Sequence, residues 1–171
     1  MEKGYIHVYT GNGKGKTTAA FGLALRAACA DKKVFIGQFV KGMKYSEVKV
    51  CDLLKNIDIE QFGLECFINK EPKEEDILIA RKGLEKIEKI IENNTYDVVV
   101  LDEINIALYY NLFKLSEVLD ILSKKPQNME IVCTGRYAKD ELIEFADLVT
   151  EMKEIKHYYN EGVEARRGIE C

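Results

Sequence analysis

The chain has 171 residues, of which 47% are hydrophobic and 32% are charged, an ordinary composition for a globular protein able to bury a core. Its net charge of −4 argues against binding to nucleic acid, which requires a basic surface. No stretch approaches the roughly 18 consecutive apolar residues that cross a membrane, and residues 1–5 lack the apolar run of a signal peptide. We expect a single domain over residues 1–171, with no nucleic acid and no membrane among its partners.

The five cysteines are odd in number and widely spaced, at Cys29, Cys51, Cys66, Cys133 and Cys171. None belongs to a C-x-x-C pair, so the sequence suggests neither a zinc site nor a disulfide framework. Cys29 and Cys133 lie in apolar stretches and are expected as small core residues. A reducing, cytoplasmic location fits this pattern best.

Short apolar segments typical of strands alternate along the chain with segments of helical spacing. The expected strands are residues 6–9, 34–39, 57–62, 98–101, 131–134 and 148–152. The expected helices are residues 17–29, 46–55, 74–93, 116–125 and 139–145. This alternation predicts an α/β fold with a mainly parallel sheet and helices on both faces.

A glycine-rich segment, T-G-N-G-K-G-K-T at residues 10–17, joins the first expected strand to the first expected helix. That strand–loop–helix context is typical of a phosphate-binding loop, or P-loop. Its backbone N–H groups would cradle phosphate oxygens, and the helix would add the positive end of its dipole. Thr10 stands where the usual pattern has its first glycine, while Gly11 and Gly13 supply the flexibility.

Several polar side chains predict that the nucleotide is bound with Mg²⁺. Lys16 is placed to reach the terminal phosphates, and the Thr17 hydroxyl to bind the metal. The apolar strand 98–101 ends in Asp102 and Glu103. In P-loop proteins such a strand is expected beside the one that feeds the loop, so that its acid holds Mg²⁺ directly or through water. We favour Glu103 as the ligand, with Asp102 supporting it; a solvated strand end is the alternative.

Arg136 follows the expected strand 131–134 through Gly135, so it should emerge at the same sheet edge as the P-loop. An arginine at that point could bind phosphate with two hydrogen bonds and stabilise the charge of a leaving group. Lys16 and Arg136 are therefore the candidate catalytic residues. A surface arginine without a role remains the alternative for Arg136.

Three stretches together resemble the ATP:corrinoid adenosyltransferase family of the BtuR/CobO type: residues 10–22, residues 101–108, and the tail that contains Lys156-His157, Gly162-Val163 and Gly168-Ile169-Glu170. The resemblance covers residues 4–170. It implies a RecA-like P-loop fold, commonly in a homodimer. It also implies a reaction in which a reduced cobalt(I) corrinoid attacks the 5′ carbon of ATP and tripolyphosphate leaves, as part of cobalamin biosynthesis or salvage.

The same resemblance implies roles for particular residues. The triphosphate would be held by the P-loop, with Gly11 beside Asn12, Gly13, Lys14, Gly15, Lys16, Thr17 and Thr18. Arg136 would bind phosphate oxygens and Glu103 the magnesium, with Gln38 and Lys41 as looser candidates nearby. The cobalt nucleophile is intrinsically strong, so the lack of an obvious nucleophile–base set is expected. An external electron donor must reduce the cobalt, since no flavin or iron–sulfur motif is visible.

Members of this family often carry Phe and Trp in the loop after the third strand, where they pack against the corrin. This chain has no Trp, and its loop, residues 63–73, offers Phe67, with Phe62 at the end of the preceding strand. We expect Phe67 and Phe62 to contact the corrinoid; anchoring of the loop in the core is the alternative. His157, in the tail, is expected to be structural.

Two other functions are compatible with a P-loop. A conventional ATPase or phosphotransferase would release orthophosphate or a phosphorylated product. A non-catalytic sensor would bind nucleotide or corrinoid without turnover. The adenosyltransferase is preferred because ordinary P-loop ATPases have no reason to carry the tail motif.

Overall fold

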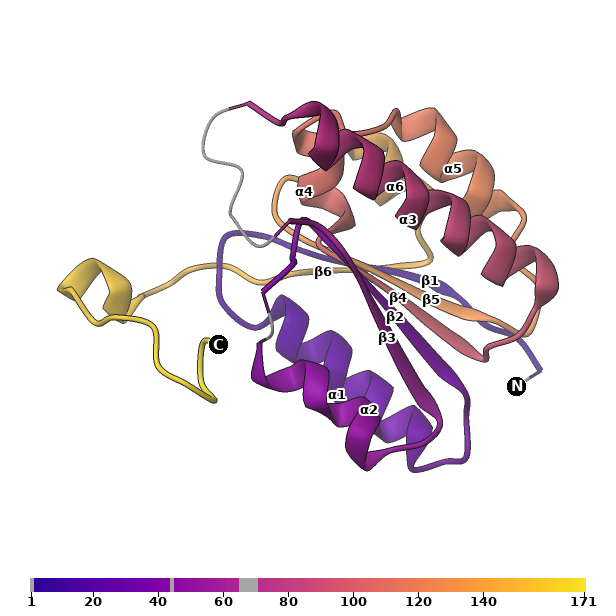
Figure 1. Cartoon of the computed structure of the whole chain (residues 1–171), viewed down its shortest axis with the longest axis horizontal. Coiled ribbons are helices and arrows are strands. Elements are labelled where there is room, and N and C mark those ends of the chain that lie inside the picture. Colours follow the sequence, from indigo (N-terminus) through magenta and orange to yellow (C-terminus); the bar gives the residue numbers. More distant parts are fainter. Residues whose placement is uncertain (1, 44, 65–70) are drawn as a thin grey trace.

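The computed structural model describes residues 2–43, 45–64 and 71–171. Within them, six strands form one sheet in the order β3-β2-β4-β5-β1-β6, and every strand pair is parallel (Figure 1). The strands are β1 Ile6–Thr10, β2 Val34–Phe39, β3 Ile57–Phe62, β4 Val98–Asp102, β5 Glu130–Thr134 and β6 Leu148–Glu151. The predicted α/β architecture with its parallel sheet is confirmed.

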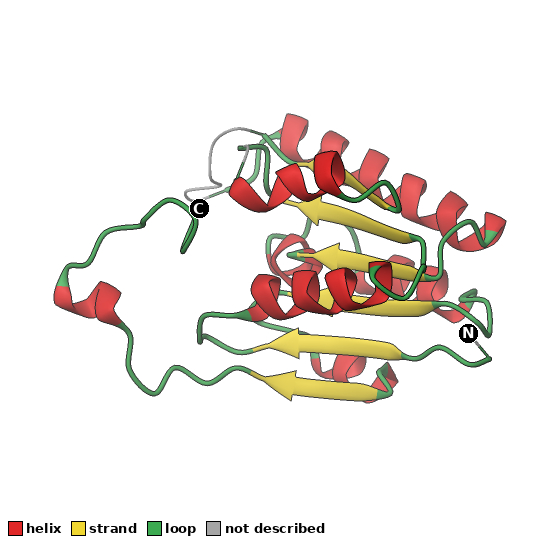
Figure 2. Cartoon of the chain, turned by 90° about the horizontal axis from the view of Figure 1, so that it is seen from below, coloured by secondary structure: helices red, strands yellow, loops and turns green. Residues whose placement is uncertain are grey.

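Helices cover both faces of the sheet, as Figures 1 and 2 show. One face carries α1 Lys16–Ala28 and the short α2 Val50–Leu53; the other carries α3 Glu74–Asn93, α4 Ile104–Tyr109, α5 Leu115–Ser123 and α6 Asp140–Phe145. A buried apolar cluster fills the space on each side, because the central strands present branched side chains to both faces. β4 is buried along its whole length.

The order of the strands corrects one expectation. The acidic strand β4 does not lie beside β1, the strand that feeds the P-loop; β5 stands between them. This is the RecA-like order, in which the phosphate loop and the acidic strand flank a third strand. The carboxyl ends of all three meet at one edge of the sheet, so the expected grouping of their polar residues survives.

Two helical segments also differ from the expectation. The helix expected over residues 46–55 is a 3₁₀ turn, Ser46–Lys49, followed by the four-residue α2. The helix α4 was not predicted; it begins immediately after Glu103. No spacer separates strand from helix there, because Glu103 takes a left-handed conformation (φ 60°, ψ 21°) that turns the chain within one residue.

Beyond β6 the chain leaves the body of the molecule as a mostly exposed tail, drawn yellow in Figure 1, and then returns. The Lys14 ammonium donates to the Ile169 carbonyl at 2.7 Å, and the Ser46 hydroxyl to the Cys171 carbonyl at 3.1 Å. Cys133 is buried in the core as expected, whereas Cys29 is exposed at the end of α1. Among the described residues, no helix has both the length and the apolar character needed to cross a membrane.

Candidate functional site

The P-loop connects β1 to α1 and packs against the start of the tail. The Gly13 N–H donates to the Met152 carbonyl at 2.6 Å, and a Cβ at Gly13 would lie 2.6 Å from the same oxygen. Only glycine allows this approach. Gly11, Asn12, Gly13, Lys14 and Gly15 form the loop, while Lys16, Thr17 and Thr18 form the first turn of α1.

Lys16 lies buried across the mouth of the loop. Its ammonium donates to the Gly11 carbonyl at 2.6 Å and to the Gly13 carbonyl at 2.7 Å. Burial lowers the pKa of Lys16; Glu103 and Asp102 offset this only partly, and Arg136 adds to it. The cation is thus already positioned where phosphate oxygens would arrive at a P-loop.

Asp102 ends β4 and is fully buried. One of its oxygens accepts from the hydroxyls of Thr17 at 2.9 Å and Thr134 at 2.7 Å. The other accepts from the Gln38 amide at 3.1 Å and the Lys41 ammonium at 2.8 Å. A carboxylate has about four acceptor positions, and all of them are used here. Asp102 therefore acts as the hub that joins α1, β2 and β5 at the sheet edge.

Lys41 supplies the positive charge that balances Asp102. It follows β2, whose Gln38 stands opposite Asp102 in the sheet register. Burial alone would lower the pKa of Lys41, but the charge of Asp102 and its hydrogen bond, with the charges of Glu103 and Glu47, raise it above its ordinary value. Lys41 stays protonated and also lies 3.3 Å from the Thr17 hydroxyl oxygen.

Glu103, in contrast, presents a carboxylate that is available. Its backbone N–H is bound to the Thr134 hydroxyl at 3.0 Å, but among the described residues nothing donates to its side-chain oxygens. Burial first, and the charge of Asp102 second, raise the pKa of Glu103 against the opposing charges of Lys41, Lys16 and Arg136. A partly desolvated carboxylate of this kind gains from a cation placed beside it.

The loop after β5 carries Arg136 into the same region. Gly135 has φ 128°, and a Cβ there would lie 3.0 Å from the Asn105 Cβ and 3.2 Å from a Glu103 carboxylate oxygen. The Asn105 amide nitrogen donates to the Gly135 carbonyl at 3.0 Å and fixes the loop. Arg136 is exposed, yet its charge acts on both Lys16 and Glu103. The structure thus brings Arg136 to the edge at which the sequence placed it.

The two corrinoid candidates have different outcomes. Phe67 lies outside the described residues. Phe62 is only 5% exposed: its ring meets Phe39 at 5.4 Å between centroids, and Gly83 on α3 packs directly against it. In this conformation Phe62 anchors the end of β3 in the core, the alternative considered for it, and offers almost no surface to a ligand.

The tail also contacts the P-loop through an ion pair that the motif did not specify. Lys14 forms an ion pair with Glu170 at 3.1 Å, and Glu170 also binds Arg166 and the Tyr158 hydroxyl. His157 accepts a hydrogen bond from the Tyr159 N–H and caps a 3₁₀ turn, which fits the structural role expected of it. The tail motif therefore folds onto the P-loop.

Sequence reasoning missed one buried polar residue of the site. Asn105 is fully buried, and its amide oxygen has no hydrogen-bond partner among the described residues. The signal was present, since Asn105 is a polar residue in the apolar run Ile104–Leu108. Thr134, the last residue of β5, was not predicted as part of the site either, although its hydroxyl donates to the Asp102 carboxylate and accepts from the Glu103 N–H.

The RecA-like sheet order, the loop between β1 and α1, and the acidic end of β4 define a P-loop protein of the nucleotide-dependent class. The model of the family "ATP:corrinoid adenosyltransferase BtuR/CobO/CobP" matches residues 2–171. Curated proteins named corrinoid adenosyltransferase are similar over 99% of this chain. One from Sinorhizobium is 41% identical, with 81% of its own length covered, and one from Escherichia coli K12 is 33% identical, with 86% covered. The chain belongs to the ATP:corrinoid adenosyltransferase family.

Proposed function

We propose that this protein transfers the 5′-deoxyadenosyl group of ATP to the cobalt of a reduced corrinoid and releases tripolyphosphate. The observation that carries the proposal is a P-loop between β1 and α1 in a chain that matches the family model over residues 2–171. The reaction itself needs no nucleophilic side chain, because the reduced cobalt is the nucleophile.

The electrons balance without a general base. The cobalt(I) centre donates an electron pair to C5′ and forms the Co–C bond, and formally becomes cobalt(III). The bond between C5′ and the α-phosphate oxygen breaks, and its electron pair leaves with the tripolyphosphate. The protein must align carbon and cobalt and stabilise charge on the leaving group. Reduction to cobalt(I) requires an external one-electron donor.

The leaving group would be stabilised by the P-loop N–H groups together with Lys16 and Arg136. Lys16 already lies across the loop, so it would exchange two carbonyl partners for phosphate oxygens. Arg136, exposed and without a carboxylate partner among the described residues, is available for bidentate phosphate contact. Thr18 and Asn12 are exposed at the loop and would contribute their backbone N–H groups.

The residues also fit a magnesium ion bound with the nucleotide. Mg²⁺ is commonly held by one or two protein oxygens plus substrate phosphates, so a cluster of three acidic ligands is not required. Glu103 has a carboxylate without donors, whereas Asp102 has all four acceptor positions filled. We therefore assign direct contact to Glu103 and the Thr17 hydroxyl, with Asp102 orienting Thr17. The ion would neutralise charge on the departing phosphates.

The test is an anaerobic assay with Mg-ATP and chemically reduced cobalamin. We expect a light-sensitive adenosyl–cobalt product together with one equivalent of tripolyphosphate, and a loss of more than about a hundredfold in rate for Lys16→Ala. Lys32→Ala, in the connection between the far end of α1 and β2, is the matched control and should leave the rate unchanged.

Other results of this assay would contradict the proposal and assign another function. Orthophosphate without a cobalt–carbon product would assign a conventional ATPase or phosphotransferase. Binding of ATP and corrinoid with neither product would assign a sensor. The homodimer stays a prediction, and sedimentation of the purified chain with and without corrinoid tests it.

A further inference from the structure

An exposed pair of stacked tyrosines lies beside the site and has no part in the function described so far. Tyr109 ends α4, and Tyr137 follows Arg136 in the loop after β5. Their ring centroids are 4.6 Å apart with planes tilted by 32°. The side chains come from different parts of the chain, so the fold rather than the local sequence brings them together.

The pair is close to the transfer chemistry. Tyr109 is six residues after Glu103 along one short helix, a rise of about 9 Å. Tyr137 stands between Arg136, whose charge reaches Lys16 and Glu103, and Ala138, whose N–H donates to the Thr10 hydroxyl at 3.4 Å. The tyrosines therefore flank the end of the site that holds the magnesium carboxylate and the phosphate-binding arginine.

Three properties distinguish this pair from core packing. Tyr109 is 50% exposed and Tyr137 is 48% exposed. Tyr137 has φ 62°, a conformation that is costly for a bulky residue and that is concentrated at ligand-binding sites. Within residues 2–43, 45–64 and 71–171, neither tyrosine hydroxyl makes a hydrogen bond within the chain. An exposed aromatic surface held in a strained backbone, with free hydroxyl groups, is suited to a flat ligand with polar edges.

We propose that Tyr109 and Tyr137 form the platform on which the corrin ring is seated during adenosyl transfer. A corrin is a large conjugated macrocycle whose periphery carries amide or carboxyl groups. The tyrosine rings supply apolar area, and their hydroxyls and Arg136 reach its polar rim. This inference rests on the proposed function and assigns its corrinoid contact to residues other than Phe62, which is buried.

The geometry favours the corrin over the adenine ring as the occupant. The two tyrosines contact each other, so no slot between them remains for a base to enter. Their outer surface is open, which suits a ligand wider than a nucleobase that must arrive and leave as one unit. The Arg136 guanidinium lies 5.7 Å from the Tyr137 centroid and links the platform to the phosphate contacts.

Steady-state kinetics with varied cob(I)alamin and with varied ATP test the proposal. We expect Tyr137→Ala and Tyr109→Ala each to raise the KM for cob(I)alamin about tenfold, in line with loss of one aromatic stacking contact. The KM for ATP should stay within about twofold. Tyr137→Phe and Tyr109→Phe should recover most of the affinity, because they keep the ring.

Tyr5→Ala is the matched control. Tyr5 is 42% exposed and has Lys3 over its ring at 4.9 Å, but it precedes β1 at the opposite edge of the sheet. Its substitution should leave both KM values unchanged. Thermal unfolding of each variant separates a folding defect from a binding defect.

Two results would overturn the platform. One is an unchanged KM for cob(I)alamin in folded Tyr137→Ala and Tyr109→Ala proteins that still form adenosylcobalamin. The other is a rise in the KM for ATP alone, which would assign the rings to adenine. If the parent protein made no adenosylcobalamin at all, the proposed function itself would fail, and that outcome is distinct from both.

Discussion

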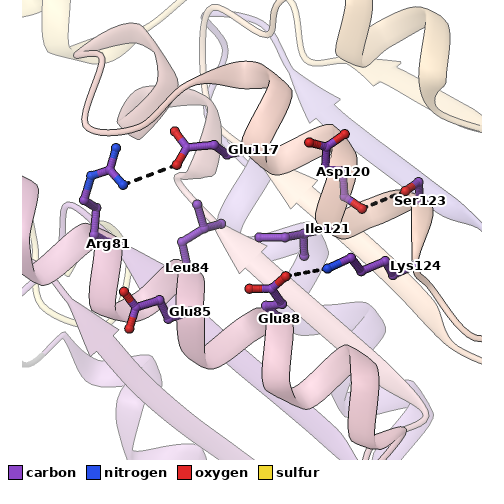
Figure 3. Close-up of a pocket in the computed structure, with 9 residues that line it drawn as sticks. All are labelled: Arg81, Leu84, Glu85, Glu88, Glu117, Asp120, Ile121, Ser123 and Lys124. Atoms are coloured by element: carbon purple, nitrogen blue, oxygen red, sulfur yellow. Dashed lines mark hydrogen bonds and ion pairs between the residues drawn. The ribbon is translucent and has the colours of Figure 1, made fainter.

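Two regions of this molecule, the carboxyl edge of the sheet and the surface between α3 and α5, accommodate charged side chains in opposite ways. At the carboxyl edge of the sheet, Asp102 is fully buried and receives four hydrogen bonds, from α1, β2, β5 and the loop after β2. Between α3 and α5, a surface cavity of about 530 Å³ is lined by four acidic residues, of which Glu88 and Glu117 pair with exposed basic side chains. Figure 3 shows the pairs Arg81–Glu117 and Glu88–Lys124 bridging the two helices over that cavity.

The difference separates a functional site from a surface depression. Burying a charge costs free energy unless it is paired and fully hydrogen-bonded, so the Asp102 cluster demands contributions from distant parts of the sequence. The ion pairs between α3 and α5 are exposed to solvent, so their charges cost little free energy to accommodate and need few hydrogen-bond partners. Cavity volume therefore singles out the α3–α5 surface, whereas concentrated and fully hydrogen-bonded polar groups single out the P-loop edge of the sheet.

The largest effect is expected for Asp102→Asn, which disrupts the buried cluster at the carboxyl edge. The amide presents an NH₂ group to two of the four donors and leaves the partly buried Lys41 ammonium without its paired carboxylate. We expect a loss of about 3 kcal/mol in the free energy of unfolding and a fall in adenosylation of about a hundredfold. Denaturant titration and the anaerobic assay measure the two effects.

Asp97→Asn is the control for that variant, since Asp97 precedes β4 as Asp102 ends it. Asp97 accepts from the Lys33 N–H at 2.9 Å at the amino edge of the sheet. Its replacement should cost about 1 kcal/mol or less and leave activity intact. Equal losses for both variants would contradict the view that the carboxyl edge alone holds the site.

A smaller effect is expected for Lys41→Met. Asp102 keeps three donors, and Lys41 is partly exposed, so we expect a loss of about 2 kcal/mol in stability near neutral pH. The folded-state pKa of Lys41 is raised, so its contribution is present below its ordinary pKa and is lost as pH rises through the folded value. The gap between parent and variant should therefore narrow only in strongly alkaline solution. If the difference in unfolding free energy already narrowed between pH 6 and 8, the Lys41–Asp102 ion pair would not be the cause of the lost stability.

Residue order alone predicted much of this site, because the ends of parallel strands must meet at one edge. Lys16, Thr17, Glu103 and Arg136 follow from that rule, and the structure brings them together. The sequence could not place Gln38 opposite Asp102, since register between β2 and β4 depends on pairing across 64 residues. The strand ends therefore predict which residues meet at the edge, but not which of them hydrogen-bond to one another.

The remaining misses have local causes. α4 has only six residues and follows β4 with Glu103 alone between them, so the segment is too short for helical spacing to show in the sequence. Phe62 ends β3, a strand in which buried and more exposed positions largely alternate. Shifting that alternation by one residue would turn its ring from the core to the opposite face of the sheet, and the sequence does not fix which of the two applies. The Tyr109–Tyr137 contact joins residues 28 positions apart and has no signature in the sequence.

Tyr96→Phe tests a hydrogen bond away from the functional edge. The Tyr96 hydroxyl donates to Asp58 at 2.9 Å, and its ring packs on Phe35. Burial, then the hydrogen bond and charge of Asp58, raise the pKa of Tyr96 to about 12. A raised tyrosine pKa stabilises the fold below the ordinary value near 10, and the contribution is lost between about 10 and about 12.

For Tyr96→Phe we expect a loss of about 1 kcal/mol at pH 8, shrinking as pH rises above 10, and unchanged adenosylation. The ring contact survives in phenylalanine, so only the hydroxyl is tested. Unfolding by urea at pH 8, 9, 10 and 11 gives the dependence. If the difference in unfolding free energy between parent and variant grew with pH, the Tyr96–Asp58 hydrogen bond would not be the cause of the lost stability.

The smallest change is expected for Arg81→Gln in the α3–α5 cavity. Arg81 meets Glu117 at 3.2 Å, but both side chains are exposed, and Glu117 keeps its bond to the Lys114 N–H at 2.7 Å. An exposed pair of this kind contributes about 0.5 kcal/mol or less, and salt screens it further. Stability should therefore change little in low salt and not at all in 1 M salt, with adenosylation unaffected. A clear loss of activity in folded Arg81→Gln protein would show that the cavity takes part in function, and that exposed charge cannot be dismissed on energetic grounds in this molecule.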